Sequence, residues 1–210
     1  MEKTRDNLIK NRMDCYIVDS VSEVVPLVES LIPAGSTVAS GGSVTLAQTG
    51  VTELLRNGSY KYLDRSGLTG EDVKKCYRDS FAADVYLCSS NAITEVGELY
   101  NVDGNGNRIA ALCYGPDSVI VVAGCNKIVC NIEEAVRRVK TIAAPANTTR
   151  LDCDTYCREK GECMAYASGD HTLTAGCRSE QRICCSYMIT ACQRVKGRIK
   201  VILVGESLGY

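Results

Sequence analysis

Short apolar runs that alternate with helical segments constrain the fold of this 210-residue chain more than any other feature. Residues 15–18, 37–39 and 118–123 are apolar runs next to turn residues, which is typical of buried strands. Residues 21–31 and 132–143 repeat apolar side chains at helical spacing, and the polar Ser20 and Asn131 stand where helix caps belong. This alternation predicts an α/β domain with a largely parallel sheet.

The remaining elements follow from the same patterns. Residues 91–103 contain two β-prone pieces around Gly97, which predicts a small hairpin. Residues 187–194 and 199–205 are separated by Lys196-Gly197, and we expect them to pair as a terminal hairpin. Pro145 is expected to end the helix 132–143. Further strands are predicted at 60–63 and 83–88, and further helices at 1–12, 44–56, 70–80 and 108–114.

Composition and charge exclude several classes of protein. A hydrophobic content of 45% supports a packed core. Lys and Arg number 24 against 25 Asp and Glu, so the chain lacks the basic excess typical of nucleic-acid binding. No stretch reaches the ~18 apolar residues of a membrane span, and charged residues stand where a signal peptide would need an apolar core. We therefore expect a cytoplasmic protein with neither a nucleic-acid nor a membrane partner, and a homo-oligomer is compatible with the sequence.

Thirteen cysteines need an explanation in a reducing compartment, where thiols serve as buried hydrophobes or metal ligands. Seven of them crowd between Cys153 and Cys192, and this cluster requires a chemical reason. The other six are scattered singly and are predicted to lie in the core: Cys15, Cys76, Cys88, Cys113, Cys125 and Cys130.

A loop of glycines and hydroxyls, residues 40–45, joins a predicted strand to a predicted helix. Backbone N–H groups at such a place can approach an anion, and the hydroxyls of Ser43 and Thr45 can add hydrogen bonds. The simpler interpretation is a tight turn in which Ser43 caps the helix. Lys127 follows the strand 118–123 and reaches the same sheet edge, either to contact a bound anion or as a solvated surface lysine.

Several longer motifs resemble the lactate utilization (LUD) domain family. They are GGSVTL at 41–46, ADVYLCSSNAITE at 83–95, ELYNVDGNGNR at 98–108 and VGESLGY at 204–210. The resemblance implies a Rossmann-like layered sheet similar to that of the phosphosugar isomerase and coenzyme A transferase superfamily. It also implies a role in the oxidation of lactate or a similar 2-hydroxy acid, alongside iron–sulfur redox proteins. One LUD-type domain would then span residues 1–210.

The resemblance also indicates which residues meet a small anionic metabolite. It supports an anion site at Gly41, Gly42, Ser43 and Thr45, since ligands of α/β sheets lie at the carboxyl ends of strands. In the wider superfamily, a loop bearing Thr and an acidic residue meets the substrate at the position of 91–95. Candidate ligand-binding residues there and beyond are Asn91, Thr94 and Arg108; candidate acids or bases are Glu95 and Asp103, with Glu98 as a further carboxylate.

Each of these assignments has a simpler alternative. The alternative for Asn91 and Asp103 is that they satisfy turn backbone groups, as Asx residues do. Arg108 pairs either with an anionic substrate or, through a salt bridge, with its own loop. A carboxylate held in a cleft can have a raised pKa suited to proton transfer, which is what a catalytic Glu95 would need.

The cysteine cluster matches an insert of the same family, C-x5-C-x2-C-x6-C, at Cys157, Cys163, Cys177 and Cys184. The match departs from the pattern between the pairs, where thirteen residues, including His171, replace two. Four converging thiolates need a central cation, which suits either zinc or a [4Fe–4S] cluster. We expect a four-cysteine metal centre in an insert at about 148–186. Free thiols or disulfides are the alternative, and Cys153, Cys185, Cys192 or His171 are replacement ligands.

Three functions remain open from the sequence. The first is a redox-associated protein of 2-hydroxy acid metabolism. The second is an enzyme that acts on a phosphorylated or coenzyme A-linked molecule through Glu95 and the loop 40–45. The third is a binding protein whose metal site is structural.

Overall fold

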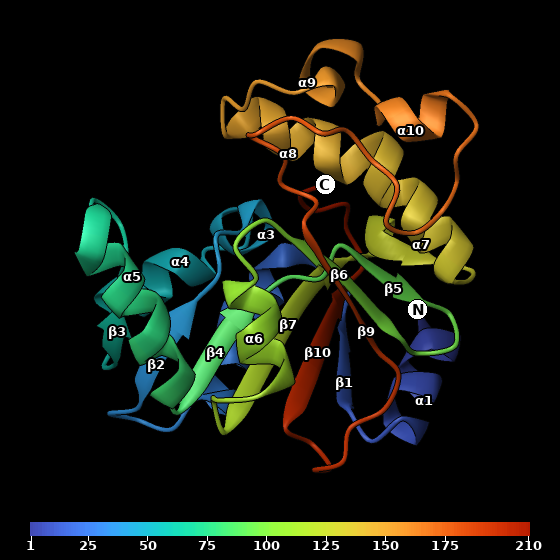
Figure 1. Ribbon diagram of the computed structural model, residues 1–210. Helices are drawn as coiled ribbons and strands as arrows, with labels where there is room; N and C mark the ends of the chain where they lie inside the picture. The colour runs from blue at the N-terminus through green and yellow to red at the C-terminus, as the bar shows by residue number, and fades with distance from the viewer.

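Six parallel strands form the main sheet of the computed structural model, which describes residues 1–210 (Figure 1). Their order across the sheet is β1 (Asp14–Val18), β10 (Ile199–Val204), β7 (Ser118–Gly124), β4 (Val85–Cys88), β2 (Thr37–Ser40) and β3 (Lys61–Leu63). Every neighbouring pair is parallel, so the carboxyl ends of all six strands lie at one edge. The predicted α/β fold is confirmed.

Alternate side chains of the main sheet enter two separate cores. On β7, Val119 and Val121 join one core, and Ile120 and Val122 join the other, because side chains alternate along a strand. The first core includes residues of α1 (Glu2–Lys10) and α6 (Asn107–Cys113). The second includes residues of α2 (Val24–Leu31), α3 (Val44–Gln48) and α4 (Val51–Asn57). Burial on both faces explains why these strands are continuously apolar.

A second sheet covers part of the first core. Its order is β8 (Ile128–Val129), β5 (Ala92–Thr94), β6 (Leu99–Asp103) and β9 (Ser186–Thr190). Strands β5 and β6 are antiparallel around Gly97, whose φ of 86° requires glycine there, so the predicted hairpin is confirmed. The outer face of this sheet packs on α7 (Ile132–Arg138).

The predicted terminal hairpin is wrong. Strand β9 pairs with β6 in the second sheet, and β10 lies between β1 and β7 in the main sheet. The turn before β10 therefore connects two sheets. Burial explains the difference, because nearly all of β10 is buried, and a strand buried on both faces is stabilised by a neighbour on each side.

Two predicted helices also differ. The helix expected at 44–56 is broken into α3 and α4 at Gly50, which has a φ of 76°. Pro145 does not end a helix: α7 continues through a π-helical turn, Val139–Ala143, into α8 (Ala144–Arg150). Proline is tolerated at the π-helical turn because the carbonyl of Lys140 in that turn accepts instead from the N–H of Cys163, at 2.9 Å. The other helical elements are α5 (Gly70–Asp79) and the short 3₁₀ turns Val21–Glu23, Ser80–Ala82 and Cys125–Lys127.

The cysteine-rich segment, residues 151–185, lies over α7 and α8 (Figure 1). It contains only the short helices α9 (Tyr156–Lys160) and α10 (Met164–Ala167). Thr155, Cys157 and Ala165 are its only buried residues, so it has few apolar anchors of its own. No helix of the chain has both the length and the apolar character that crossing a membrane requires.

The prediction that six scattered cysteines lie in the core is partly wrong. Cys76 and Cys88 are buried, and Cys15 and Cys125 are half-buried. Cys113 and Cys130 are exposed, at the end of α6 and after β8. Apolar neighbours in the sequence could not show whether a cysteine lies on the buried face of a helix or strand or at its exposed end.

Candidate functional site

A cavity of about 590 Å³ lies at the carboxyl edge of the main sheet. It is lined by the segments that follow β2, β3, β4, β7 and β10, and by residues of α8 and of the cysteine-rich segment. The C-terminus marked in Figure 1 lies between the sheet and α8, where Gly209 and Tyr210 line this cavity. In parallel α/β sheets, ligands bind at this edge.

The structure brings most of the predicted site residues to this one cavity. Those that line it are Gly41, Gly42, Ser43, Thr45, Asn91, Asp103, Arg108 and Lys127. Thr94 and Glu95 are not among its lining residues.

Lys127 is the most unusual of these residues. It is 3% exposed, and its Nζ lies 3.0 Å from Thr45 Oγ1 and 2.9 Å from Ser89 Oγ. It has no carboxylate partner, because none of the chain's salt bridges includes it. Burial, followed by the charges of Arg138 and Arg108, lowers the pKa of Lys127 to about 7. The alternative of a solvated surface lysine is wrong.

The glycine–hydroxyl loop forms the helix-capping turn of the simpler interpretation, and its anion-binding role stays a prediction. Ser43 caps α3 by accepting a hydrogen bond from the N–H of Leu46 at 3.2 Å. Thr45 holds the amino group of Lys127, as described above. Gly42 lies directly under Arg65, since a Cβ built on Gly42 would be 2.2 Å from Arg65 Nη2.

Arg65 and Arg150, which sequence reasoning missed, line this cavity. Neither forms a salt bridge: Arg65 donates to the hydroxyl of Tyr77, and Arg150 donates to Asn147 and Tyr210. Arg65 follows the strand β3. Residues that follow parallel strands lie at the carboxyl edge of the sheet, and this argument, which identified Lys127, would have identified Arg65 too. Arg150 was missed because the helix that carries it was expected to end at Pro145.

Arg108 turns out to hold its own loop. Its Nε and Nη2 both donate to Asp103 Oδ1, at 3.0 and 2.6 Å. Its remaining N–H groups donate to Asn91, Asn101 and the carbonyls of Ser89 and Val102. Asp103 Oδ2 accepts from the N–H of Ile109. The salt-bridge alternative is therefore what the structure shows, and neither side chain has a strong hydrogen-bonding group left for a ligand.

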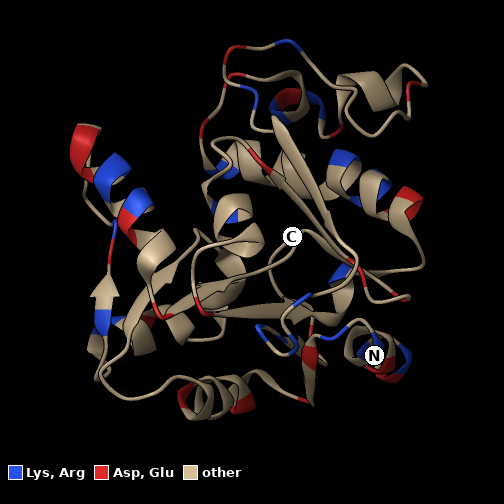
Figure 2. Ribbon diagram, turned by 60° about the horizontal axis from the view of Figure 1, so that its bottom comes forward, with Lys and Arg blue, Asp and Glu red and all other residues tan.

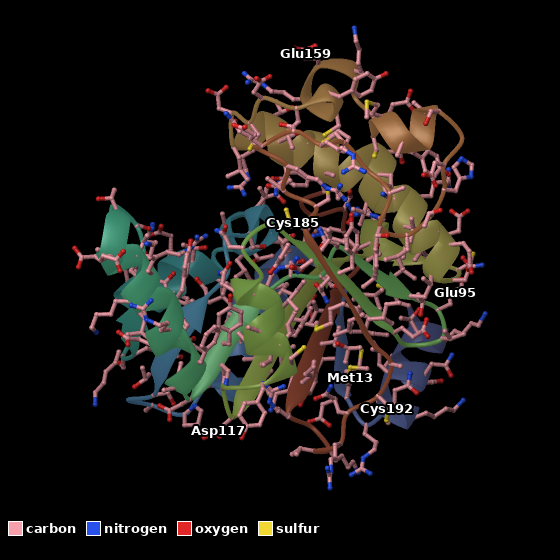
Figure 3. The ribbon with its side chains drawn as sticks, in the orientation of Figure 1. Met13, Glu95, Asp117, Glu159, Cys185 and Cys192 are labelled. Carbon is pink, nitrogen blue, oxygen red and sulfur yellow. The ribbon has the colours of Figure 1, made fainter.

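Glu95 lies elsewhere, on the turn between β5 and β6 beside α1 (Figure 3). Its Oε2 pairs with Lys3 Nζ at 2.6 Å, and that hydrogen bond lowers the pKa of Glu95. The raised pKa expected of a general acid is therefore not found. Thr94 is buried and bonded to Glu98, so it stabilises the same turn.

The four cysteines of the family pattern line a second, smaller cavity. Cys157, Cys163, Cys177 and Cys184 surround a space of about 20 Å³, enough for about one water molecule. Burial raises the pKa of the Cys184 thiol to about 12, and the nearby Cys157 thiol adds to the shift. No three His, Cys, Asp or Glu side chains are arranged to hold a metal ion in this structure.

Lys140 lines the same small cavity and carries the clearest sign of a missing partner. It is 1% exposed, and its Nζ has no hydrogen-bond partner. Burial of an ammonium group without a partner is costly, so an anionic group is expected beside it. His171, the alternative ligand, is exposed and stacks on Tyr166 with ring centroids 4.2 Å apart.

The two cavities share one wall, formed by Ala144, Arg182, Ile183 and Cys184. Arg182 fixes this wall by donating to the carbonyls of Cys177 and Cys184 and to the hydroxyl of Tyr187. Cys185 faces the large cavity, and Figure 3 shows it between the cysteine-rich segment and the sheets, away from Glu95. Charges elsewhere are mixed: Figure 2 shows basic and acidic residues interspersed on α1 and α5.

Comparison with known proteins gives a family and a fold. The family model described as LUD domain matches residues 1–204. A crystal structure of a DUF162 family protein from Deinococcus radiodurans is similar, with a TM-score of 0.53 and 15% identity, covering 97% of this chain and 94% of that chain. At this identity the likeness concerns the fold alone.

Two further solved structures are more distant. Ribose 5 phosphate isomerase A from Neisseria gonorrhoeae has a TM-score of 0.34 and 13% identity, with 62% of this chain and 56% of that chain covered. eIF2B delta from Chaetomium thermophilum has a TM-score of 0.34 and 19% identity, with 59% and 52% covered. None of the curated proteins compared with the chain matches it.

Proposed function

Because the chain belongs to the LUD domain family, we propose that its large cavity binds a small anionic metabolite, namely lactate or a similar 2-hydroxy acid. Family membership implies a function related to lactate utilization, and the metabolite itself is our proposal. The observation that carries it is Lys127, a buried cation that has only hydroxyl partners and lines the cavity.

The charge balance of the cavity supports an anionic ligand. Lys127, Arg65 and Arg150 line it without a carboxylate partner. Of the carboxylates that line it, Asp103 is paired with Arg108 and Glu180 is exposed to solvent. Lys127 is the one of the three that is held away from water, and a positive charge there favours an anion because the low dielectric strengthens the attraction. The hydroxyls of Ser43 and Thr45 add neutral hydrogen-bonding groups that suit a carboxylate or a hydroxyl.

Thermal shift and calorimetric titration with L-lactate, glycolate, inorganic phosphate and coenzyme A test this proposal. We expect L-lactate or glycolate to stabilise the protein. Gly42→Val should weaken binding by about tenfold or more, since its side chain would displace Arg65 and enter the cavity. Stabilisation by phosphate or coenzyme A alone would favour the phosphorylated or coenzyme A-linked class instead. An equal response in Gly42→Val would place the ligand outside this cavity.

We also propose a four-cysteine metal centre, either zinc or [4Fe–4S], at Cys157, Cys163, Cys177 and Cys184. Four cysteine thiolates suit both groups and form an anionic complex with either. Lys140 is the cation that such a complex would satisfy. The hydroxyls of Thr148 and Thr155 lie 3.5 and 3.4 Å from Cys157 Sγ and can support this ligand. The four thiols are therefore the right donor types for either group, and binding it requires them to move closer together than they are in this structure.

A metal centre at this place would lie against the wall of the metabolite cavity. That position supports a redox association with iron–sulfur partner proteins over a purely structural site. Elemental analysis and an absorption spectrum of anaerobically purified protein separate the two. Iron with sulfide and visible absorption would support the redox role, whereas stoichiometric zinc would make the site structural.

A further inference from the structure

Lys127 is the single lysine among the residues that line the large cavity. It is carried by the 3₁₀ turn after β7, so its backbone is fixed at the carboxyl edge of a central strand. Its amino group is held between Thr45 on one side and Ser89 on the other. Both partners are hydroxyls, which can accept from a protonated amine and can either donate to or accept from a neutral one.

The charges that face this amino group come from three elements. Arg138 of α7 and Arg108 of α6 are cationic, and Cys88 of β4 is a thiol. Burial and the two guanidinium groups hold the pKa of Lys127 at about 7. A large share of the amino groups is therefore neutral near pH 7. Lysines made nucleophilic by desolvation or by a neighbouring cation react with carbonyl compounds.

The same cavity also contains a cationic side chain that can hold a carboxylate, Arg65. Arg65 lies over Gly42 without a carboxylate partner, and Gly42 lies in the short connection that leads into α3, the helix of Thr45. A ligand that reaches both groups has a carbonyl carbon next to or near a carboxylate. This describes a 2-oxo acid, the oxidised counterpart of the 2-hydroxy acid proposed above.

We propose that Lys127 forms an imine with the carbonyl group of a small 2-oxo acid bound in the large cavity. The inference rests on the proposed function, because it assigns a substrate class to the same cavity. The Nζ lone pair attacks the carbonyl carbon, and the carbonyl oxygen takes up a proton. The resulting carbinolamine loses water as the C=N bond forms. Amine and carbonyl thus give imine and water, and no electrons are exchanged.

Trapping with borohydride tests this chemistry in the full-length protein. Pyruvate is the probe, and sodium borohydride reduces the imine to a stable amine that intact-mass measurement detects. We expect one reduced pyruvate adduct per chain near pH 7, and peptide mapping should place it on Lys127. Exposed lysines remain protonated at this pH, so they should react far more slowly.

Two variants make the test specific. Lys127→Arg keeps the positive charge but cannot form an imine, and it should lose the adduct completely. Lys200→Arg is the matched control, because burial also lowers the pKa of Lys200, which bonds to Ser118 at the opposite end of the strands. This control should retain the adduct.

The outcomes separate this inference from the proposed function. Lactate binding by titration without any pyruvate adduct would overturn the imine and leave the proposed function standing. An adduct on Lys140 or on surface lysines, undiminished in Lys127→Arg, would also overturn it. An adduct on Lys127 without any lactate binding would support the imine and contradict the proposed 2-hydroxy acid.

Discussion

The two cavities each contain a buried lysine, and the difference between these lysines distinguishes the two sites. Lys127 has two hydroxyl partners, Thr45 in the first turn of α3 and Ser89 directly after β4. Lys140 has no partner at all, and the thiols around it come from short helices and irregular chain. The large cavity is therefore built before its ligand binds, whereas the small one lacks the anionic group that would complete it.

The two sites also differ in how firmly the fold holds them, because one is formed by paired strands and the other by short helices and irregular chain. Residues of the large cavity are held by strands paired on both sides and by the Arg108–Asp103 network. The cysteine-rich segment has only three buried residues and depends on Arg182 and a few backbone contacts. We expect metal binding to supply much of the order of this segment.

Loss of one thiol should have the largest effect. Cys184→Ser is expected to abolish stoichiometric metal, because a tetrahedral or cubane site needs all four cysteines. It should also make residues 151–185 sensitive to protease while the sheets stay folded, as limited proteolysis and elemental analysis would show. Cys113→Ser, which removes an exposed thiol, is the control. Full metal content in a Cys177→Ser variant would instead implicate Cys153, Cys185 or His171.

Removal of Arg108 should affect stability more than ligand affinity. Arg108→Met leaves Asp103 as a buried carboxylate without its partner, which costs about 3 kcal/mol or more of unfolding free energy. Urea unfolding measures the loss. A variant of unchanged stability that no longer binds lactate would show that Arg108 serves the ligand and that the network is dispensable.

Lys140→Met tests the contrast between the two lysines directly. Because Lys140 is expected to support an anionic metal complex, the variant should release metal to a chelator about tenfold more readily. The metal-free variant should be at least as stable as the parent, since an unpartnered cation has been removed. Unaltered metal release would mean that the charge of Lys140 plays no part in the second cavity.

The pH dependence of lactate affinity should report Lys127. Its pKa is about 7 in the folded chain and near 10.4 in the unfolded chain. Between pH 7 and about 10.4 the folded state therefore binds fewer protons than the unfolded state. The contribution of Lys127 to the free energy of unfolding therefore increases as pH rises through that range and is lowest below pH 7. Lactate affinity should fall as pH rises above 7, because the amino group loses its charge. Calorimetry at several pH values should give a flatter profile for Lys127→Arg.

Glu95→Gln should have the smallest effect. Glu95 pairs with Lys3 at the surface and lies outside both cavities. Lactate affinity and metal content are expected to equal those of the parent. Once an activity is known, a large loss of turnover in this variant would contradict the placement of the active site at the large cavity.

Much of the site could be read from the sequence because parallel strands bring their carboxyl ends to one edge. That rule, together with the family resemblance, placed Gly42, Thr45, Asn91 and Lys127 together. The rule failed for Glu95. This residue follows β5, which belongs to the second sheet, and it lies on the turn of the β5–β6 hairpin and not at the carboxyl edge of the main sheet. Arg108 was misjudged because the sequence does not show how many acceptors surround a guanidinium group.

The sequence by itself determined the α/β architecture, the β5–β6 hairpin, the LUD resemblance and the grouping of four cysteines in one segment. These features depend on local periodicity, turn residues and spacing, all of which are properties of neighbouring residues. Tertiary structure alone decided that β9 and β10 belong to different sheets, that Lys127 and Lys140 are buried without carboxylates, and that the two cavities share a wall. Burial and partner number depend on residues far apart in the chain, so they are set only when the layers pack together.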